Sequence, residues 1–184
     1  MKIKHMLSAL AFAGMMAVAG PVFAAGNIYN TLKGDPQFST LVSVIDATGT
    51  KHNYTGGERT VFAPTNAAFE ALKGGYQDML GTTDRTNTQA LLLYQIVPGK
   101  HTPASLAGKT TTLGTLQKAK VTISGADGAL HYGDDKYGAT QAGAAISASN
   151  GVIIPIDAFP VPVFEQGDDG VPVPAPVTTR TPLN

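Results

Sequence analysis

Residues 60–69, with the sequence TVFAPTNAAF, contain a change from strand to helix within one short segment. The apolar residues that precede Pro64 are typical of a buried strand. Pro64 ends that strand, because proline has no amide hydrogen for a central ladder. Thr65 or Asn66 can accept a backbone hydrogen bond at the start of a helix. We therefore predict a strand over 60–63 and a helix from near Thr65, with the apolar side chains of both elements packed onto one core.

Helical patterns occur on both sides of this segment. Asp35-Pro36 is typical of an N-cap followed by proline in the first helical turn, and Gly49 can end the same helix in a left-handed conformation. The segment from Gly49 to Glu58 is polar and rich in turn formers, so it is predicted as a loop. The expected helices cover residues 27–33, 36–48, 65–73 and 87–94.

The second half of the chain has a different period. Residues 119–124 alternate between apolar and polar side chains, which indicates a half-buried strand, and residues 129–132 form a second short strand. Asn150-Gly151 is a tight-turn pair that leads into a strand at 152–154. Pro155 removes a ladder donor, so this strand is expected to lie at a sheet edge or to be bulged there. Helices in the first half and strands in the second predict an α+β fold rather than an alternating α/β one.

The two ends differ from the segment between them. Residues 1–24 have basic residues, a short apolar run and a small residue at Ala24, which together predict a secretory signal peptide. The apolar run is shorter than the ~20 residues that a membrane-spanning helix needs, so no stable membrane insertion is expected. Residues 164–184 are rich in proline and are predicted to be a disordered or polyproline-like tail. A single folded domain over residues 25–163 remains, in a protein that is periplasmic or secreted.

Composition excludes several functions. Basic and acidic residues balance at 13 each, and removal of the signal leaves a net charge of −2, which gives no electrostatic reason to expect nucleic acid as a partner. The chain has no cysteine, so disulfides, thiol catalysis, iron–sulfur clusters and zinc–thiolate sites are excluded.

No catalytic or metal-binding pattern is found in the chain. His52, His101 and His131 are far apart in sequence and include no pair at metal-ligand spacing. Asp127 and the pair Asp134-Asp135 lie among glycine and lysine, which favours hairpin turns over a calcium loop. Nucleophile elbows, metalloprotease helices and phosphate-binding or dinucleotide-binding glycine loops are absent from the sequence. We therefore predict no enzyme activity, no cofactor and no metal.

Three separated segments resemble the fasciclin domain family. Residues 60–69 are similar to the first motif of that family, residues 91–99 (LLLYQIVPG) to its central Tyr-His segment, and residues 149–157 (SNGVIIPID) to its second motif. They occur in the family's order, and the resemblance covers about residues 26–163. It implies a compact domain with a bent, wedge-shaped β-sheet and several helices packed beside it. It also implies an adhesion or protein-binding module outside the cytoplasm.

The chain departs from the family pattern at two places. Gln95 stands where the family usually has histidine after the tyrosine, and Ile154-Pro155 replaces the pattern around a histidine in the second motif. Glutamine keeps the capacity to form hydrogen bonds, but its charge does not change near neutral pH.

The motif residues have two roles in this interpretation. Tyr94, Gln95 and Ile96 are the candidate binding residues, although apolar neighbours favour burial of the Tyr94 ring. The others are expected to support the fold, since apolar residues at periodic positions usually form core. These residues are Thr60, Phe62, Pro64, Thr65, Asn66, Phe69, Asn150, Gly151, Val152, Ile153 and Asp157.

Three functions follow in order of preference. The first is an exported fasciclin-domain module that binds a cell-surface or matrix protein or a polysaccharide. The second is a periplasmic carrier or sensor of a small apolar ligand, which a hydrophobic pocket with convergent polar groups would favour. A hydrolase without a recognisable signature comes last.

Overall fold

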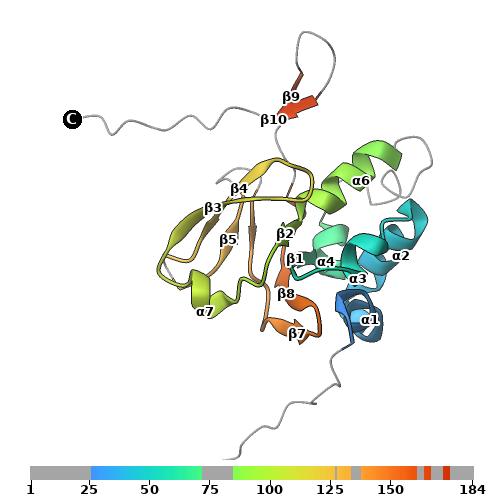
Figure 1. The fold of residues 1–184 in the computed structure, drawn as a ribbon, viewed down its shortest axis with the longest axis horizontal. Helices are drawn as coiled ribbons and strands as arrows, with labels where there is room; N and C mark the ends of the chain where they lie inside the picture. The colour runs from blue at the N-terminus through green and yellow to red at the C-terminus, as the bar shows by residue number, and fades with distance from the viewer. Residues whose placement is uncertain are drawn as a thin grey trace, which may run out of the picture.

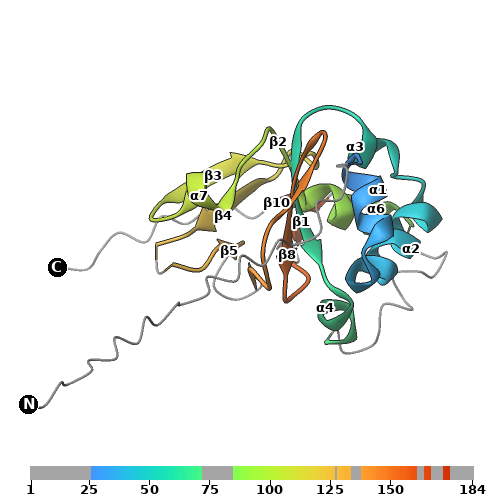
Figure 2. The same cartoon turned by 90° about the horizontal axis from the view of Figure 1, so that it is seen from below.

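The computed structural model describes residues 26–71, 85–126, 128–133 and 138–160, and the backbone of two short strands at 164–166 and 172–174. The described part has three layers (Figures 1 and 2). A four-stranded sheet lies in the middle, helices cover one of its faces, and a second four-stranded sheet packs beside the other face. The predicted α+β class is confirmed.

The helical layer comes mainly from the first half of the chain. The Asn27 side chain caps the helix that begins at Ile28, and the Asp35 side chain caps the 3-10 helix that begins at Pro36. Each accepts a backbone hydrogen bond. Gly49 ends α2 in the left-handed conformation (φ 72°), as its position predicted. The elements are α1 (Ile28–Gly34), η1 (Pro36–Phe38), α2 (Ser39–Thr48), α3 (His52–Thr55), α4 (Asn66–Glu70) and α6 (Arg85–Tyr94).

The central sheet has the order β2-β1-β8-β7. β1 (Arg59–Pro64) and β8 (Gly151–Ile156) are parallel neighbours along six residue pairs. β2 (Ile96–Pro98) and β7 (Ile146–Ala148) are antiparallel to them on the outer sides. Near-continuous apolar runs in β1 and β8 are typical of strands that are buried on both faces.

The outer sheet is wholly antiparallel, with the order β3-β4-β5-β6. Its strands are β3 (Thr110–Gly114), β4 (Lys120–Ser124), β5 (His131–Tyr132) and β6 (Ala139–Thr140). A one-turn helix, α7 (Pro103–Leu106), precedes β3. Val121 and Ile123 of β4 are buried, whereas the polar residues between them are at least partly exposed, which confirms the predicted alternation.

The interior is divided into two cores by the central sheet. Val61 and Phe69 belong to the core between this sheet and the helices. Phe62, which points to the opposite face of β1, belongs to the core between the two sheets. The expectation that β1 and α4 pack onto one core is therefore wrong for Phe62, because successive side chains of a strand face opposite ways and both faces of this sheet are covered.

Local differences from the sequence-based expectation have simple causes. The segment predicted as a loop between Gly49 and Glu58 contains the single turn α3. β8 is central rather than an edge strand, but its partner β7 stops opposite Ile153. Pro155 therefore lies beyond β7 and removes no hydrogen bond from that ladder.

The signal peptide over residues 1–24 and the disordered or polyproline-like tail over residues 164–184 stay predictions. The signal peptide, the aspartates 127, 134 and 135, and the part of the third predicted helix beyond residue 71 lie outside the described residues. Within the Pro-rich tail, β9 (Phe164–Gln166) pairs antiparallel with β10 (Pro172–Pro174). Among the described residues each of these two strands pairs only with the other, which is a setting that proline tolerates.

We predict that Gly151→Ala destabilises the domain severely. Gly151 has φ 152°, and a Cβ at this position would lie 1.8 Å from the carbonyl oxygen of Arg59 in β1. Backbone cannot move aside cheaply, so we expect a loss of about 3 kcal/mol or more in the free energy of unfolding, measured by denaturant or thermal melts. Gly34→Ala is the control: a Cβ there meets nothing within 4 Å. Equal stability of the two variants would contradict this account.

Candidate functional site

The three motif segments meet in space as adjacent strands of the central sheet. The first motif forms β1, the central segment forms β2, and the second motif forms β8. Thr60 lies between its partners Val97 in β2 and Val152 in β8. Segments that are about 30 to 90 residues apart in sequence therefore form one continuous structural unit.

Thr60 supplies a buried polar link at the start of β1. Its side chain has no exposed surface. The hydroxyl donates to the carbonyl oxygen of Gly99 at 2.8 Å and accepts from the amide of His101 at 2.7 Å. A fully paired hydroxyl in the interior avoids the cost of burial and fixes the segment after β2 against β1.

The residues after β1 hold α4 in place. Pro64 is buried, and the Thr65 hydroxyl accepts a hydrogen bond from the amide of Ala68, as predicted for a cap. The Asn66 side chain contacts both η1 and α2. Its Oδ1 accepts from the amide of Thr40 in α2 at 3.1 Å, and its Nδ2 donates to the carbonyl of Pro36 in η1 at 2.9 Å.

Asn150 forms hydrogen bonds to four residues, three through its side-chain amide and one through its backbone carbonyl. Its Oδ1 accepts from the amide of Ile28 in α1 at 2.7 Å. Its Nδ2 lies 3.2 Å from the carbonyl oxygen of Tyr54 and 3.3 Å from that of Gly57. The Asn150 carbonyl also accepts from the amide of Arg59 at 3.0 Å. The helical layer is thus anchored at the start of β8.

The remaining residues of the second motif also face the interior or hold the outer sheet. Val152 and Ile153 are buried in β8. Asp157 is exposed, and its carboxylate accepts from the amide of Thr140 at 2.7 Å, which ties the end of β8 to β6. Each of these contacts is a contact within the fold.

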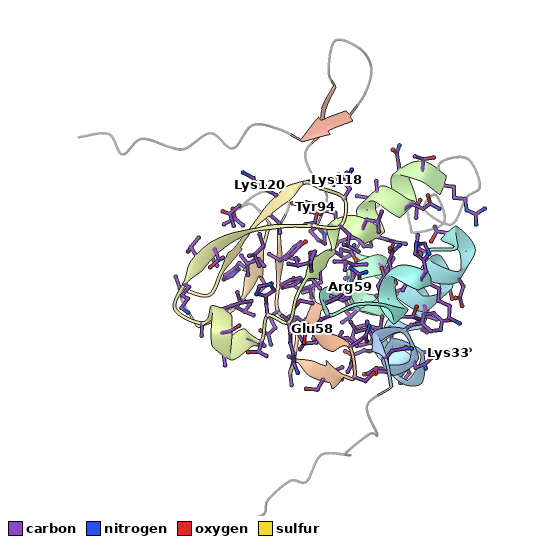
Figure 3. The ribbon with its side chains drawn as sticks, viewed as in Figure 1. Lys33, Glu58, Arg59, Tyr94, Lys118 and Lys120 are labelled. Atoms are coloured by element: carbon purple, nitrogen blue, oxygen red, sulfur yellow. The ribbon has the colours of Figure 1, made fainter. Side chains whose placement is uncertain are left out.

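Tyr94 lies in an aromatic cluster between the sheets. Its side chain is 7% exposed, and its ring lies 5.9 Å from the ring of Tyr132 in an edge-on arrangement. The Phe62 ring also packs against Tyr132, with 4.1 Å between the ring centroids. Figure 3 places Tyr94 beside the β3–β4 hairpin, which carries Lys118 and Lys120. The Tyr132 hydroxyl donates to the carbonyl of Tyr94, and burial raises the pKa of that hydroxyl well above its ordinary value.

Gln95 and Ile96 have no exposed surface. The Gln95 backbone carbonyl accepts from the amide of Phe62 at 3.0 Å. Its side-chain oxygen and nitrogen are buried without a hydrogen-bond partner in the described part of the chain. None of the three candidate binding residues presents its side chain to solvent, so burial disfavours direct contact, and their binding role stays a prediction.

A depression of about 640 Å³, lined by both polar and apolar groups, lies on the outer sheet. Thr110, Ser124, His131 and Thr140 are directly opposite one another across all four strands. Opposite residues share one face of a sheet, so these side chains form a row. The Thr110 and Ser124 hydroxyls are 3.2 Å apart, and the His131 ring nitrogen Nδ1 is 3.3 Å from the Thr140 hydroxyl. Apart from His131, the described lining has no ionisable side chain at the surface.

Sequence reasoning did not find this row. Its residues come from four strands, and only the β4 alternation indicated which side of one strand faces solvent. The cross-strand pairing that brings them together is set by loops between strands and has no local signature.

The described residues were also compared with the requirements of a metal site and of a membrane-spanning helix. No group of three or more histidine, aspartate or glutamate side chains in the described ranges could hold a metal ion. Among these same residues, no helix combines the length and hydrophobicity needed to cross a bilayer.

Comparison with known proteins finds one family and several relatives. The family described as Fasciclin domain matches residues 36–162. Immunogenic protein MPB70 of Mycobacterium bovis is 33% identical over 68% of this chain and 58% of its own length. Protein sll1483 of Synechocystis is 33% identical over 76% of this chain and 75% of its own length. Cell surface glycolipoprotein MPB83 of Mycobacterium bovis is 35% identical over 61% of this chain and 51% of its own length.

The fold is also found in a solved structure. A FAS1 domain pair from the insect cell adhesion molecule fasciclin I has a TM-score of 0.63 and 14% sequence identity. The likeness covers 79% of this chain and 53% of that chain, and at this identity it shows the fold. The chain spans little more than half the length of the two mycobacterial relatives.

We predict that Gln95→Met raises the stability of the domain. Methionine has a similar volume and removes two buried polar atoms without partners, so the free energy of unfolding should rise by about 1–3 kcal/mol. Gln89→Met is the matched control, because the Gln89 amide donates to the Thr48 carbonyl at 2.8 Å and its loss should destabilise. A less stable Gln95 variant would mean that a buried water pairs with the amide.

We predict a loss of stability at alkaline pH. Burial raises the pKa of the Tyr54 and Tyr132 hydroxyls, so above the ordinary tyrosine pKa of about 10 the folded chain holds more protons than the unfolded chain. The free energy of unfolding should be independent of these groups below about pH 9 and fall as the pH rises above 10. Urea-induced unfolding at several pH values measures this dependence of the free energy of unfolding on pH. Tyr54→Phe should show a shallower fall; an unchanged slope would contradict the assignment to Tyr54.

Proposed function

This chain belongs to the fasciclin domain family, and from that premise we propose that it is an exported binding module that mediates cell adhesion or protein–protein interaction. Its partner is a cell-surface or matrix protein or a polysaccharide, met in the periplasm or outside the cell. The export pattern of residues 1–24 and the absence of a catalytic motif support this proposal. We propose no enzymatic role.

The observation that carries the proposal is the burial of the motif residues. Tyr94, Gln95 and Ile96 lie in the interior, and the exposed Asp157 holds β6. A partner therefore meets other parts of the surface. The outer sheet offers the depression with its row of hydroxyl and imidazole groups, which can both donate and accept hydrogen bonds. We place the contact surface there.

The alternative function, a carrier or sensor of a small apolar ligand, requires a different site. Pockets for such ligands are lined mainly by apolar and aromatic side chains. The side chains that form the row in this depression are hydroxyl and imidazole groups. Because hydrogen-bonding groups from four strands meet along this row, we favour a hydrogen-bonding macromolecular partner over an apolar small molecule.

We predict that Thr122→Lys weakens partner binding by about tenfold or more without a change in melting temperature. Thr122 lines the depression, and a lysine there places a long charged side chain over the row. Binding is measured by capture of surface proteins and polysaccharides on the purified exported protein. Ser43→Lys, an exposed position on α2, is the control and should bind normally.

Variants of Tyr94 separate the structural role of this residue from direct contact. Tyr94→Ala should lose binding together with stability, because truncation of a buried aromatic side chain costs about 3–5 kcal/mol. Tyr94→Phe should retain most of both. If Tyr94→Ala melts like the parent protein and fails to bind, or if Ser43→Lys alone abolishes capture, the contact surface lies elsewhere.

A further inference from the structure

β3 is an edge strand of the outer sheet, and among the described strands only β4 forms a ladder with it. Just beyond its end the chain meets β2, where the Leu116 amide donates to the Ile96 carbonyl at 2.8 Å. The residues of β3, TTTLG, are alternately exposed and half-buried, and none is buried. With five residues, it is long enough to pair with another strand along its whole length.

The ladder between β3 and β4 fixes which backbone groups of β3 face outward. Two hydrogen bonds that flank the ladder show which residue pairs are bonded. The Gly125 amide donates to the Lys109 carbonyl at 2.8 Å, and the Thr115 amide donates to the Ala119 carbonyl at 2.9 Å. Antiparallel pairs alternate between bonded and non-bonded, so Thr111 and Leu113 are bonded to β4. The amides and carbonyls of Thr110, Thr112 and Gly114 therefore point away from β4. They form no backbone bond to another described element.

The other edges of the two described sheets have features that discourage pairing. β2 ends at a proline, and β6 and β7 have two and three residues. Proline and short length are the usual means by which proteins protect an edge. β3 has no proline, no charged residue and no bulge in its register with β4. It is the one long, unprotected edge among these strands.

We propose that β3 pairs with β3 of a second copy of this chain, antiparallel and centred on Thr112. In this register Thr112 lies opposite Thr112 of the second chain, and Thr110 of each chain lies opposite Gly114 of the other. Every outward amide and carbonyl of β3 then finds a complementary group, since each of these pairs exchanges both of its hydrogen bonds. The two four-stranded sheets become one continuous eight-stranded sheet.

A second copy fits this edge because the pattern is self-complementary. The outward groups are symmetric about Thr112, as a two-fold interface requires. No charge lies within β3, so identical strands do not repel each other. Lys109, the nearest charged residue before the strand, faces Thr115 of the other chain rather than another lysine.

The pairing has a consequence for binding. Residues directly opposite each other in antiparallel strands share one face, so the depressions of both copies lie on the same side of the joined sheet. A surface-attached partner with repeated epitopes would then be bound at two points, and the avidity would exceed the affinity of one domain.

The test measures association and its site on the protein as recovered after export. Sedimentation velocity from about 10 μM to about 1 mM should show a weak monomer–dimer equilibrium, because a small interface binds weakly. Amide exchange at Thr110, Thr112 and Gly114 should slow as the concentration rises, whereas exchange at Thr111 and Leu113, already bonded to β4, should not change. Monomer throughout this range would overturn the proposal.

Charged variants test the register. Thr112→Lys should raise the dimer dissociation constant by about fivefold or more, since like charges then oppose each other across the two-fold axis. Thr112→Glu should do the same, and an equimolar mixture of the two should dimerise again. Ser147→Lys, on the edge strand β7 of the other sheet, is the matched control and should dimerise normally.

Several outcomes would contradict the proposal. Dimerisation that Ser147→Lys abolishes and Thr112→Lys leaves intact would assign the interface to β7. Protection of the Thr112 amide that is independent of concentration would mean that another segment of the same chain covers β3. Dimerisation of the unsubstituted protein in the absence of any partner separates this inference from the proposed function, since the Thr112 hydroxyl lies 3.5 Å from that of Thr122, which lines the depression.

Discussion

The parallel pairing of β1 with β8 is the constraint on which the rest of the structure depends. It joins segments about 90 residues apart in sequence and brings the backbone of Gly151 against Arg59. β2 and β7 flank the first half of this parallel pair, and both faces of the sheet are covered. Two separate cores follow from this arrangement. The helices cover one face and the outer sheet the other, so each layer depends on the central strands for its apolar contacts.

The polar contacts of the motif residues join the helices and the segment after β2 to the same central strands. Thr60 fixes the segment after β2, Asn66 fixes α4 to the preceding helices, and Asn150 fixes α1 and the α3 segment to the start of β8. These bonds are made where chain segments of distant sequence meet, so their loss would release whole elements rather than single side chains. Gln95 is the exception among the motif residues, since its buried amide adds two polar atoms without partners in the described chain.

Local signals explain which parts of the fold could be predicted from the sequence. The cap at Asp35, the stop at Gly49 and the alternation in β4 depend on neighbouring residues, and the structure has each of them. Phe62 lies in a different core from Val61 and Phe69, although the apolar run of β1 is itself typical of a strand buried on both faces. β3 has three threonines, which favour strands, but no apolar alternation, so the sequence does not show which strand it pairs with. Its pairing with β4 is set by tertiary structure.

The same reasoning explains why the candidate site was harder to predict than the fold. A residue pattern that identifies a fold is made of the residues that the fold needs, and here those residues are buried or bonded within the domain. The proposed contact surface is made of side chains such as Ser124 and His131, which no single segment brings together. Changes on the outer face of that sheet alter hydrogen-bonding groups without disturbing either core. Under the two proposals, the domain keeps one architecture while the outer sheet and the edge of β3 set the partner.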